Sequence, residues 1–196
     1  VVVGISAGDA LIAANNCVVV GTSALGAVAT ADGTVAVGDQ ALNALTSGAG
    51  NVAVGYQALD ATTTGNYNTM IGYQAGTALP AGSHNNTALG WKSLFSGASS
   101  ATEGNTCIGY KSGFQIGTGY RNTLIGASVD VDTGSYDNVT AIGNNFEASQ
   151  DDTVFLGNAA TEEVWMASDK GATVHCGEVN IEDGTPAGQD AGVLHV

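Results

Sequence analysis

Residues 51–59 read NVAVGYQAL, residues 68–75 read NTMIGYQA, and residues 122–126 read NTLIG. Each stretch begins with Asn, followed by three apolar or β-branched residues and then Gly. These glycines, Gly55, Gly72 and Gly126, belong to one series that extends through most of the chain. A motif that returns at a fixed interval predicts a repeat architecture.

The series contains ten glycines, each preceded by an apolar pair or triplet. The steps between successive members are 17, 17, 17, 17, 18, 19, 17, 17 and 14 residues. The two longer steps carry additional loop-forming residues, around Pro80 in one and over 96–101 in the other, where a repeat tolerates insertions. The glycines are Gly4, Gly21, Gly38, Gly55, Gly72, Gly90, Gly109, Gly126, Gly143 and Gly157.

When the repeats are aligned on this Gly, the positions around it also hold similar residues, and we call each such position a column. Four residues before it, five repeats carry Asn51, Asn68, Asn86, Asn105 and Asn122. Three residues before it stand Val18, Val35, Val52, Thr69, Thr87, Thr106, Thr123, Thr140 and Val154. Directly before it stand Val20, Val37, Val54, Ile71, Leu89, Ile108, Ile125, Ile142 and Leu156. After the Gly come small residues and then Leu25, Leu42, Leu59 and Leu94, with Gly76 and Gly113 in that column at two repeats.

Seventeen residues are too few for a helical hairpin repeat and suit one coil of two or three short strands. We therefore expect an all-β parallel solenoid of about nine 17-residue coils over residues 1–157, roughly 43 Å long at ~4.8 Å per coil. The β-branched and aliphatic columns alternate with period two, so we expect both to point into the coil. Gly allows the turn that follows, and Asn stacked on Asn predicts an amide ladder. Residues 158–196 read as a β-hairpin or meander that caps the open end.

The position between the two columns is then expected to face outward. It holds Val19, Ala36, Ala53, Met70, Ala88, Cys107, Leu124, Ala141 and Phe155, with no charged or amide residue. A strand that is apolar on both faces is buried on both faces. The sequence therefore predicts a partner chain that covers this outer face, in parallel so that the coils stay in register.

Composition excludes several classes of protein. The chain has 29 Gly among 196 residues, 44% hydrophobic residues and 11% charged residues, which disfavours disorder and a typical α/β enzyme. A net charge of −14 with four Lys and Arg residues disfavours nucleic acid as a partner, and no apolar run is long enough for membrane insertion. The three cysteines, Cys17, Cys107 and Cys176, show no metal-binding or disulfide spacing.

The stretches at 51–59, 68–75 and 122–126 resemble the head repeats of trimeric autotransporter adhesins, and resemble still more the related repeats of phage tail-fibre proteins. The resemblance covers about residues 15–157 and implies a left-handed parallel β-roll assembled as a homotrimer that binds surfaces. It implies a structural and adhesive protein of the virion, with other fibre or baseplate proteins and a host surface glycan or protein receptor as partners. The alternative location is the bacterial cell surface, as the head of a trimeric adhesin.

No arrangement of Ser, His, Asp or Cys recurs at matching coil positions, so we expect no enzyme and no cofactor. A fibre-borne polysaccharide depolymerase remains the alternative from another class. Weak candidates for Ca²⁺ ligands are Asp130, Asp132 and Asp137, although a solvated acidic face is the simpler interpretation. A column of aromatic residues directly after the Gly is either a glycan-contact strip or a stack that stabilises the coils. It consists of Tyr56, Tyr73, Trp91 and Tyr110.

Overall fold

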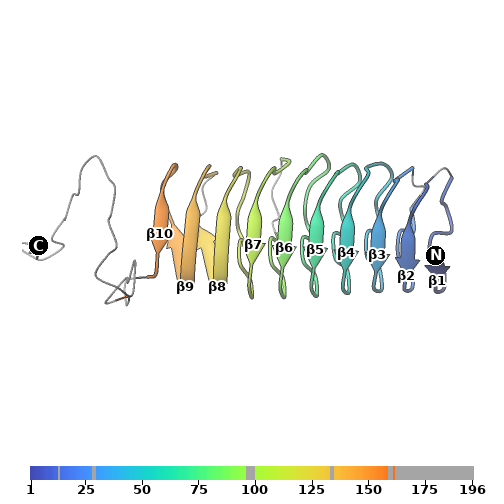
Figure 1. Ribbon diagram of the computed structural model, residues 1–196, viewed down its shortest axis with the longest axis horizontal. Helices are drawn as coiled ribbons and strands as arrows, with labels where there is room; N and C mark the ends of the chain where they lie inside the picture. The colour runs from blue at the N-terminus through green and yellow to red at the C-terminus, as the bar shows by residue number, and fades with distance from the viewer. Residues whose placement is uncertain (13, 28–29, 96–99, 133–134, 159–160, 162–196) are drawn as a thin grey trace, which may run out of the picture. The chain divides into compact units, whose positions relative to one another are not determined.

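The computed structural model describes residues 1–12, 14–27, 30–95, 100–132, 135–158 and 161. All regular structure in these residues is β-strand, and ten strands form one parallel sheet in sequence order (Figure 1). The strands are β1 Val2–Val3, β2 Val18–Val20, β3 Val35–Val37, β4 Val52–Val54, β5 Thr69–Ile71, β6 Thr87–Leu89, β7 Thr106–Ile108, β8 Thr123–Val131, β9 Thr140–Ala148 and β10 Val154–Leu156.

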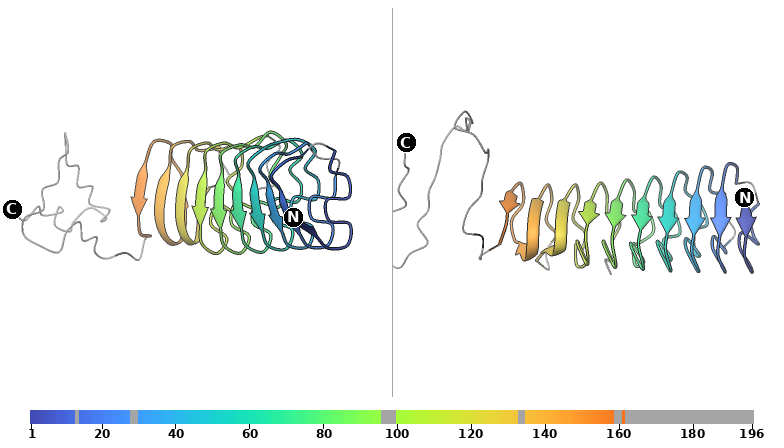
Figure 2. Two further views of the ribbon diagram at one scale, coloured as in Figure 1. Left: turned by 45° about the vertical axis from the view of Figure 1, so that its right-hand side comes forward. Right: turned by 60° about the horizontal axis from the view of Figure 1, so that its bottom comes forward.

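The pairing confirms the predicted β-solenoid. Val35 pairs with Val52, Val52 with Thr69, Thr69 with Thr87, and Thr87 with Thr106. The column keeps this register across the steps of 18 and 19 residues, so the inserted residues lie outside the strands. Both views in Figure 2 show successive coils stacked side by side from β1 to β10.

The chain divides into two compact units, Val1–Glu162 and Glu163–Val196. The solenoid belongs to the first unit, in agreement with the strands ending at Leu156. The predicted cap over 158–196 lies outside the described residues except for positions 158 and 161.

Most coils contribute one three-residue strand rather than the two or three that we expected. The rest of each coil contains residues whose backbone is left-handed at fixed positions, such as Gln57 with φ 51° and Leu59 with φ 54°. Such residues turn the chain and interrupt a strand. Their amides still bond to the next coil, as Leu59 N–H does to the carbonyl oxygen of Ala75 at 2.9 Å.

Our assignment of the strand faces was wrong. The residue between the two columns points into the coil, and this position is fully buried from Val19 in β2 to Ala141 in β9. The columns on either side point outward, so Ile71 is 37% exposed and Leu89 is 47% exposed. The physical reason is the small volume inside so short a coil, which accepts mainly small side chains at the position between the two columns.

The interior side chains compensate one another in volume. Where the fourth residue after the repeat Gly is Leu, as at Leu59, the central strand residue is small, as at Ala53, and both are fully buried. Where that residue is Gly76, the central residue is the long Met70. A Cβ at Gly76 would lie 2.7 Å from the sulfur of Met70. A small strand residue paired with Leu and a long strand residue paired with Gly therefore fill the same narrow space, as close packing requires.

The five repeated asparagines form a continuous buried ladder. Asn68 donates to the Oδ1 of Asn51 from its backbone N–H at 3.0 Å and from its Nδ2 at 3.1 Å. The same Nδ2 donates to the carbonyl oxygen of Ser83 at 2.8 Å. Asn86, Asn105 and Asn122 continue the pattern, each bonded to the Asn of the coil before it. Buried amide groups are thereby satisfied by the stacking itself.

The repeat glycines bring successive coils into backbone contact. Gly55 has φ 138°, and its N–H donates to the carbonyl oxygen of Val37 at 2.8 Å. A Cβ at Gly55 would overlap the carbonyl oxygen of Gly72 in the next coil. A side chain at this position is therefore excluded both by the backbone angle and by the neighbouring coil.

We expect Gly55→Ala to lower the free energy of unfolding by about 3 kcal/mol or more, because the methyl group forces two coils apart. The matched control is Gly33→Asn, at a corner where φ is 64° and an added Cβ meets nothing within 4 Å. Asn16, Asn85 and Asn138 adopt positive φ at the same corner, so this control should cost less than about 1 kcal/mol. Urea denaturation measures both, and equal costs would contradict the stacking.

Candidate functional site

The four aromatic residues of the sequence column lie in one exposed row. Their side chains are between 38% and 50% exposed. Neighbouring rings are stacked: the centroids of Tyr56 and Tyr73 are 5.1 Å apart, those of Tyr73 and Trp91 are 6.3 Å apart, and those of Trp91 and Tyr110 are 5.0 Å apart. Because the rings largely cover one another's faces, the row stabilises the stack and offers mainly ring edges to a ligand.

A second column, which the sequence analysis missed, runs beside the aromatic row. It is the second residue after the repeat Gly, and its backbone is left-handed, with φ between 50° and 58° at Gln40, Gln57, Gln74, Lys92 and Lys111. The glutamines form a side-chain ladder with Nε2 to Oε1 distances of 2.8 Å and 2.7 Å. Aligning this position in the sequence would have revealed the change from Gln to Lys.

The two lysines lie between aromatic rings. The Nζ of Lys92 is 4.8 Å from the centroid of Trp91 and 5.1 Å from that of Phe95. The Nζ of Lys111 is 5.7 Å from the Tyr110 centroid and 5.2 Å from the Phe114 centroid. Cation–π attraction of this kind holds the ammonium groups at the surface.

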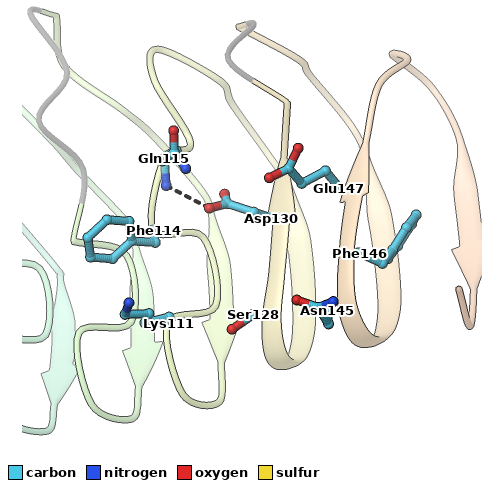
Figure 3. A pocket seen from close by; sticks show the side chains of 8 residues that line it. All are labelled: Lys111, Phe114, Gln115, Ser128, Asp130, Asn145, Phe146 and Glu147. Carbon is cyan, nitrogen blue, oxygen red and sulfur yellow. Dashed lines mark hydrogen bonds between the residues drawn. The ribbon is translucent and has the colours of Figure 1, made fainter.

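A pocket of about 500 Å³ lies where the long strands β8 and β9 replace the usual turns (Figure 3). Asp130 of β8 and Glu147 of β9 are register partners in adjacent coils. Both carboxyl groups line the pocket, together with a lysine, two phenylalanines and three polar residues. The lining residues are Lys111, Phe114, Gln115, Ser128, Asp130, Asn145, Phe146 and Glu147.

Asp130 is only 6% exposed, and its carboxylate oxygens accept hydrogen bonds from backbone amides. The N–H of Gln115 donates to Oδ2 at 2.9 Å, and the N–H of Val131 donates to Oδ1 at 2.9 Å. Burial, together with the negative charge of Glu147, raises the pKa of Asp130 to about 6, although the amide hydrogen bonds oppose the shift.

The three weak Ca²⁺ candidates do not form a common site. Asp130 faces the pocket, whereas the Oδ1 of Asp137 accepts a 2.7 Å hydrogen bond from the backbone N–H of Tyr120 at a corner of the coil. Within the described residues, no three His, Cys, Asp or Glu side chains gather in a way that could hold a metal ion. In the same residues Cys107 is a buried free thiol, and burial raises its pKa.

The outward side of the sheet carries Val, Ile and Leu side chains together with five threonines, and we call it the aliphatic flank. It consists of the two columns that flank the buried central residues, from Val18 and Val20 in β2 to Val154 and Leu156 in β10. Its most exposed aliphatic members include Leu89, Ile142, Val154 and Leu156. The flank runs the length of the stack, which distinguishes it from the scattered apolar residues of ordinary surfaces.

Comparison of the chain with protein-family models, with curated proteins and with solved structures finds no match. Across the described part of the chain, no helix has the length and hydropathy needed to cross a membrane.

The raised pKa of Asp130 can be measured by ¹³C NMR of its carboxyl carbon. We expect a midpoint at about pH 6. Because the folded protein holds this proton more tightly than the unfolded chain, ionisation of Asp130 should lower stability as the pH rises from about 4 to about 6. Glu147→Gln should lower the Asp130 midpoint, since it removes the neighbouring negative charge. A midpoint in the ordinary Asp range, or no change in the variant, would show that the pocket is not formed as described.

Proposed function

We propose that the chain is the shaft of a homo-oligomeric fibre, a phage tail fibre or similar virion appendage, that contacts the host surface. The observation that carries this proposal is the aliphatic flank. In nine coils, one β-branched and one aliphatic residue point outward. Exposing these side chains to water costs free energy, and a lone chain gains nothing in return.

A second copy of the chain is the partner that suits the flank best. Its surface repeats at each coil, so another parallel stack with the same spacing can pack against every coil at once. Rotation about an axis parallel to the stack keeps all coils at the same height and closes the assembly. The resemblance of the repeats to those of tail fibres and trimeric adhesins supports three chains.

Two further features support a mechanical role. Successive coils are joined by backbone hydrogen bonds and glycine contacts, and five of them also by the buried asparagine ladder, which together favour a rigid stack. The aromatic row and the two lysines follow the glycine turn, two and three residues after the aliphatic residue of the flank. The aromatic residues are exposed, so we propose that this part of the coil makes the surface contact.

The mass of the protein in solution tests the assembly. Light scattering after size exclusion should give three times the chain mass of 19.4 kDa. Ile71→Lys places an ammonium group on the flank and should reduce the mass to that of one chain. Gln74→Lys is the matched control on the same coil, because Lys occupies that column at Lys92 and Lys111. A wild-type mass of 19.4 kDa at micromolar concentration would contradict the proposal.

A second candidate function is a fibre-borne polysaccharide depolymerase, which the pocket between β8 and β9 favours. Glycosidases use a pair of carboxyl groups, and Asp130 and Glu147 are register partners whose side chains line one pocket. The hydrogen bonds from Gln115 and Val131 to both oxygens of Asp130 argue for a structural role instead.

Incubation with bacterial surface polysaccharides separates the two candidates. A shaft that only attaches should release no reducing ends. Release by the purified chain that disappears in Glu147→Gln would favour the depolymerase. The third candidate, a bacterial adhesin head, is distinguished by its gene, which would encode a membrane-anchor barrel downstream, whereas a chaperone segment would indicate a phage fibre.

A further inference from the structure

Lys92 and Lys111 create a local reversal of charge. The chain carries −14 overall with only four Lys and Arg residues. Between positions 61 and 120, however, the charged residues are these two lysines and Glu103, so the local sum is +2 − 1 = +1. Glu103 belongs to another corner of the coil, where Nδ2 of Asn85 donates to its carboxylate at 3.4 Å.

The two ammonium groups lie in adjacent coils. Their residues follow Gly90 and Gly109 at the same position, and the backbone N–H of Lys111 donates to the carbonyl oxygen of Trp91 at 2.9 Å. The coil spacing places equivalent atoms roughly 4.8 Å apart. Like charges at this distance repel each other. Within the described residues neither lysine forms an ion pair, so the repulsion is offset only by the surrounding rings.

The rings form walls on both sides of the lysines. On one side the centroids of Trp91 and Tyr110 are 5.0 Å apart, and on the other the centroids of Phe95 and Phe114 are also 5.0 Å apart. Both pairs are nearly parallel, with interplanar angles of 8°. The two cations are thus flanked by two pairs of stacked rings, an arrangement that we call the trough.

From this arrangement we infer that Lys92 and Lys111 bind the acidic group of a carboxylate- or phosphate-bearing saccharide on the host surface. One anionic group between two ammonium groups makes charge-assisted hydrogen bonds with both and removes their mutual repulsion. The ring walls contact the apolar faces of the sugar. The inference rests on the proposed attachment function and names the chemical class of the receptor.

The charge of the rest of the chain limits the ligand. A polyanion such as nucleic acid would be repelled by the surface outside the trough. An isolated acidic group on an otherwise neutral, hydroxyl-rich saccharide meets no such barrier. The carboxyl groups of the acidic pocket do not neutralise the two lysines. Glu147 lies two coils beyond Lys111, and Asp130 is buried with its oxygens hydrogen-bonded to backbone amides.

The repeat itself supplies variants that preserve the fold. Glutamine occupies the lysine column at Gln40, Gln57 and Gln74 with the same left-handed backbone. Lys92→Gln together with Lys111→Gln therefore extends an existing ladder. The control Arg121→Asn removes a cation at a different corner, where Asn85 and Asn138 show that Asn is accepted.

The test is titration of the purified assembled protein with sialyllactose, methyl glucuronide and mannose 6-phosphate, each against its uncharged counterpart, followed by the NMR signals of Trp91 and the lysines. We expect at least one acidic probe to bind with a Kd of ~1 mM or tighter. The double lysine variant should weaken that binding about tenfold or more, whereas Arg121→Asn should leave it unchanged. Absence of binding by all three probes, or equal binding to the double lysine variant, would overturn the inference.

Adsorption of the labelled protein to a panel of bacterial cells separates this inference from the proposed function. If the double lysine variant adsorbs as well as the wild type, attachment stands and the trough is not the site. If the wild type adsorbs to no cell but binds an acidic probe through the lysines, the site stands and attachment as proposed here falls.

Discussion

The whole fold depends on the close approach of one backbone turn to the next at the repeat glycines. At Gly55 and Gly72 the N–H of one coil reaches the carbonyl oxygen of the coil before, at 2.8 Å in both cases. No side chain fits between them. This contact fixes the coil spacing, and the spacing in turn aligns every other column: the buried asparagines, the outward aliphatic residues, the stacked aromatic rings and the lysines.

The sequence allowed the solenoid, its register and the glycine turns to be predicted, because all three follow from residues that recur at one interval. It did not allow the strand faces to be assigned. Both faces of the segment from Thr69 to Ile71 are apolar, so periodicity alone cannot tell inside from outside. The volume inside the coil decides which face points inward. Met70 fits there only because Gly76 lies opposite, and this pairing is seen only when the two columns are compared.

The candidate sites, too, could be predicted only in part from the sequence. The aromatic row was visible in the sequence, but the stacking of its rings on one another emerged only from the structure. Lys92 and Lys111 went unnoticed because two cations 19 residues apart look unrelated until the coils are aligned. In the sequence Asp130 was one of several acidic residues. The structure shows that it is buried and is the register partner of Glu147, where the long strands replace the regular turns. In a stacked fold, side chains at equivalent positions of adjacent coils lie together, so a site is found by aligning the coils rather than by following the chain.

The most direct measurement of the coil stacking is the scalar coupling transmitted through hydrogen bonds between backbone nitrogen and carbonyl carbon, recorded by NMR on the deuterated protein. The account predicts couplings from the amide of Gly55 to Val37, from Gly72 to Val54 and from Gly90 to Ile71, one coil back in each case. Couplings from these glycines to residues of their own coil, or a pattern of antiparallel hairpins, would contradict it.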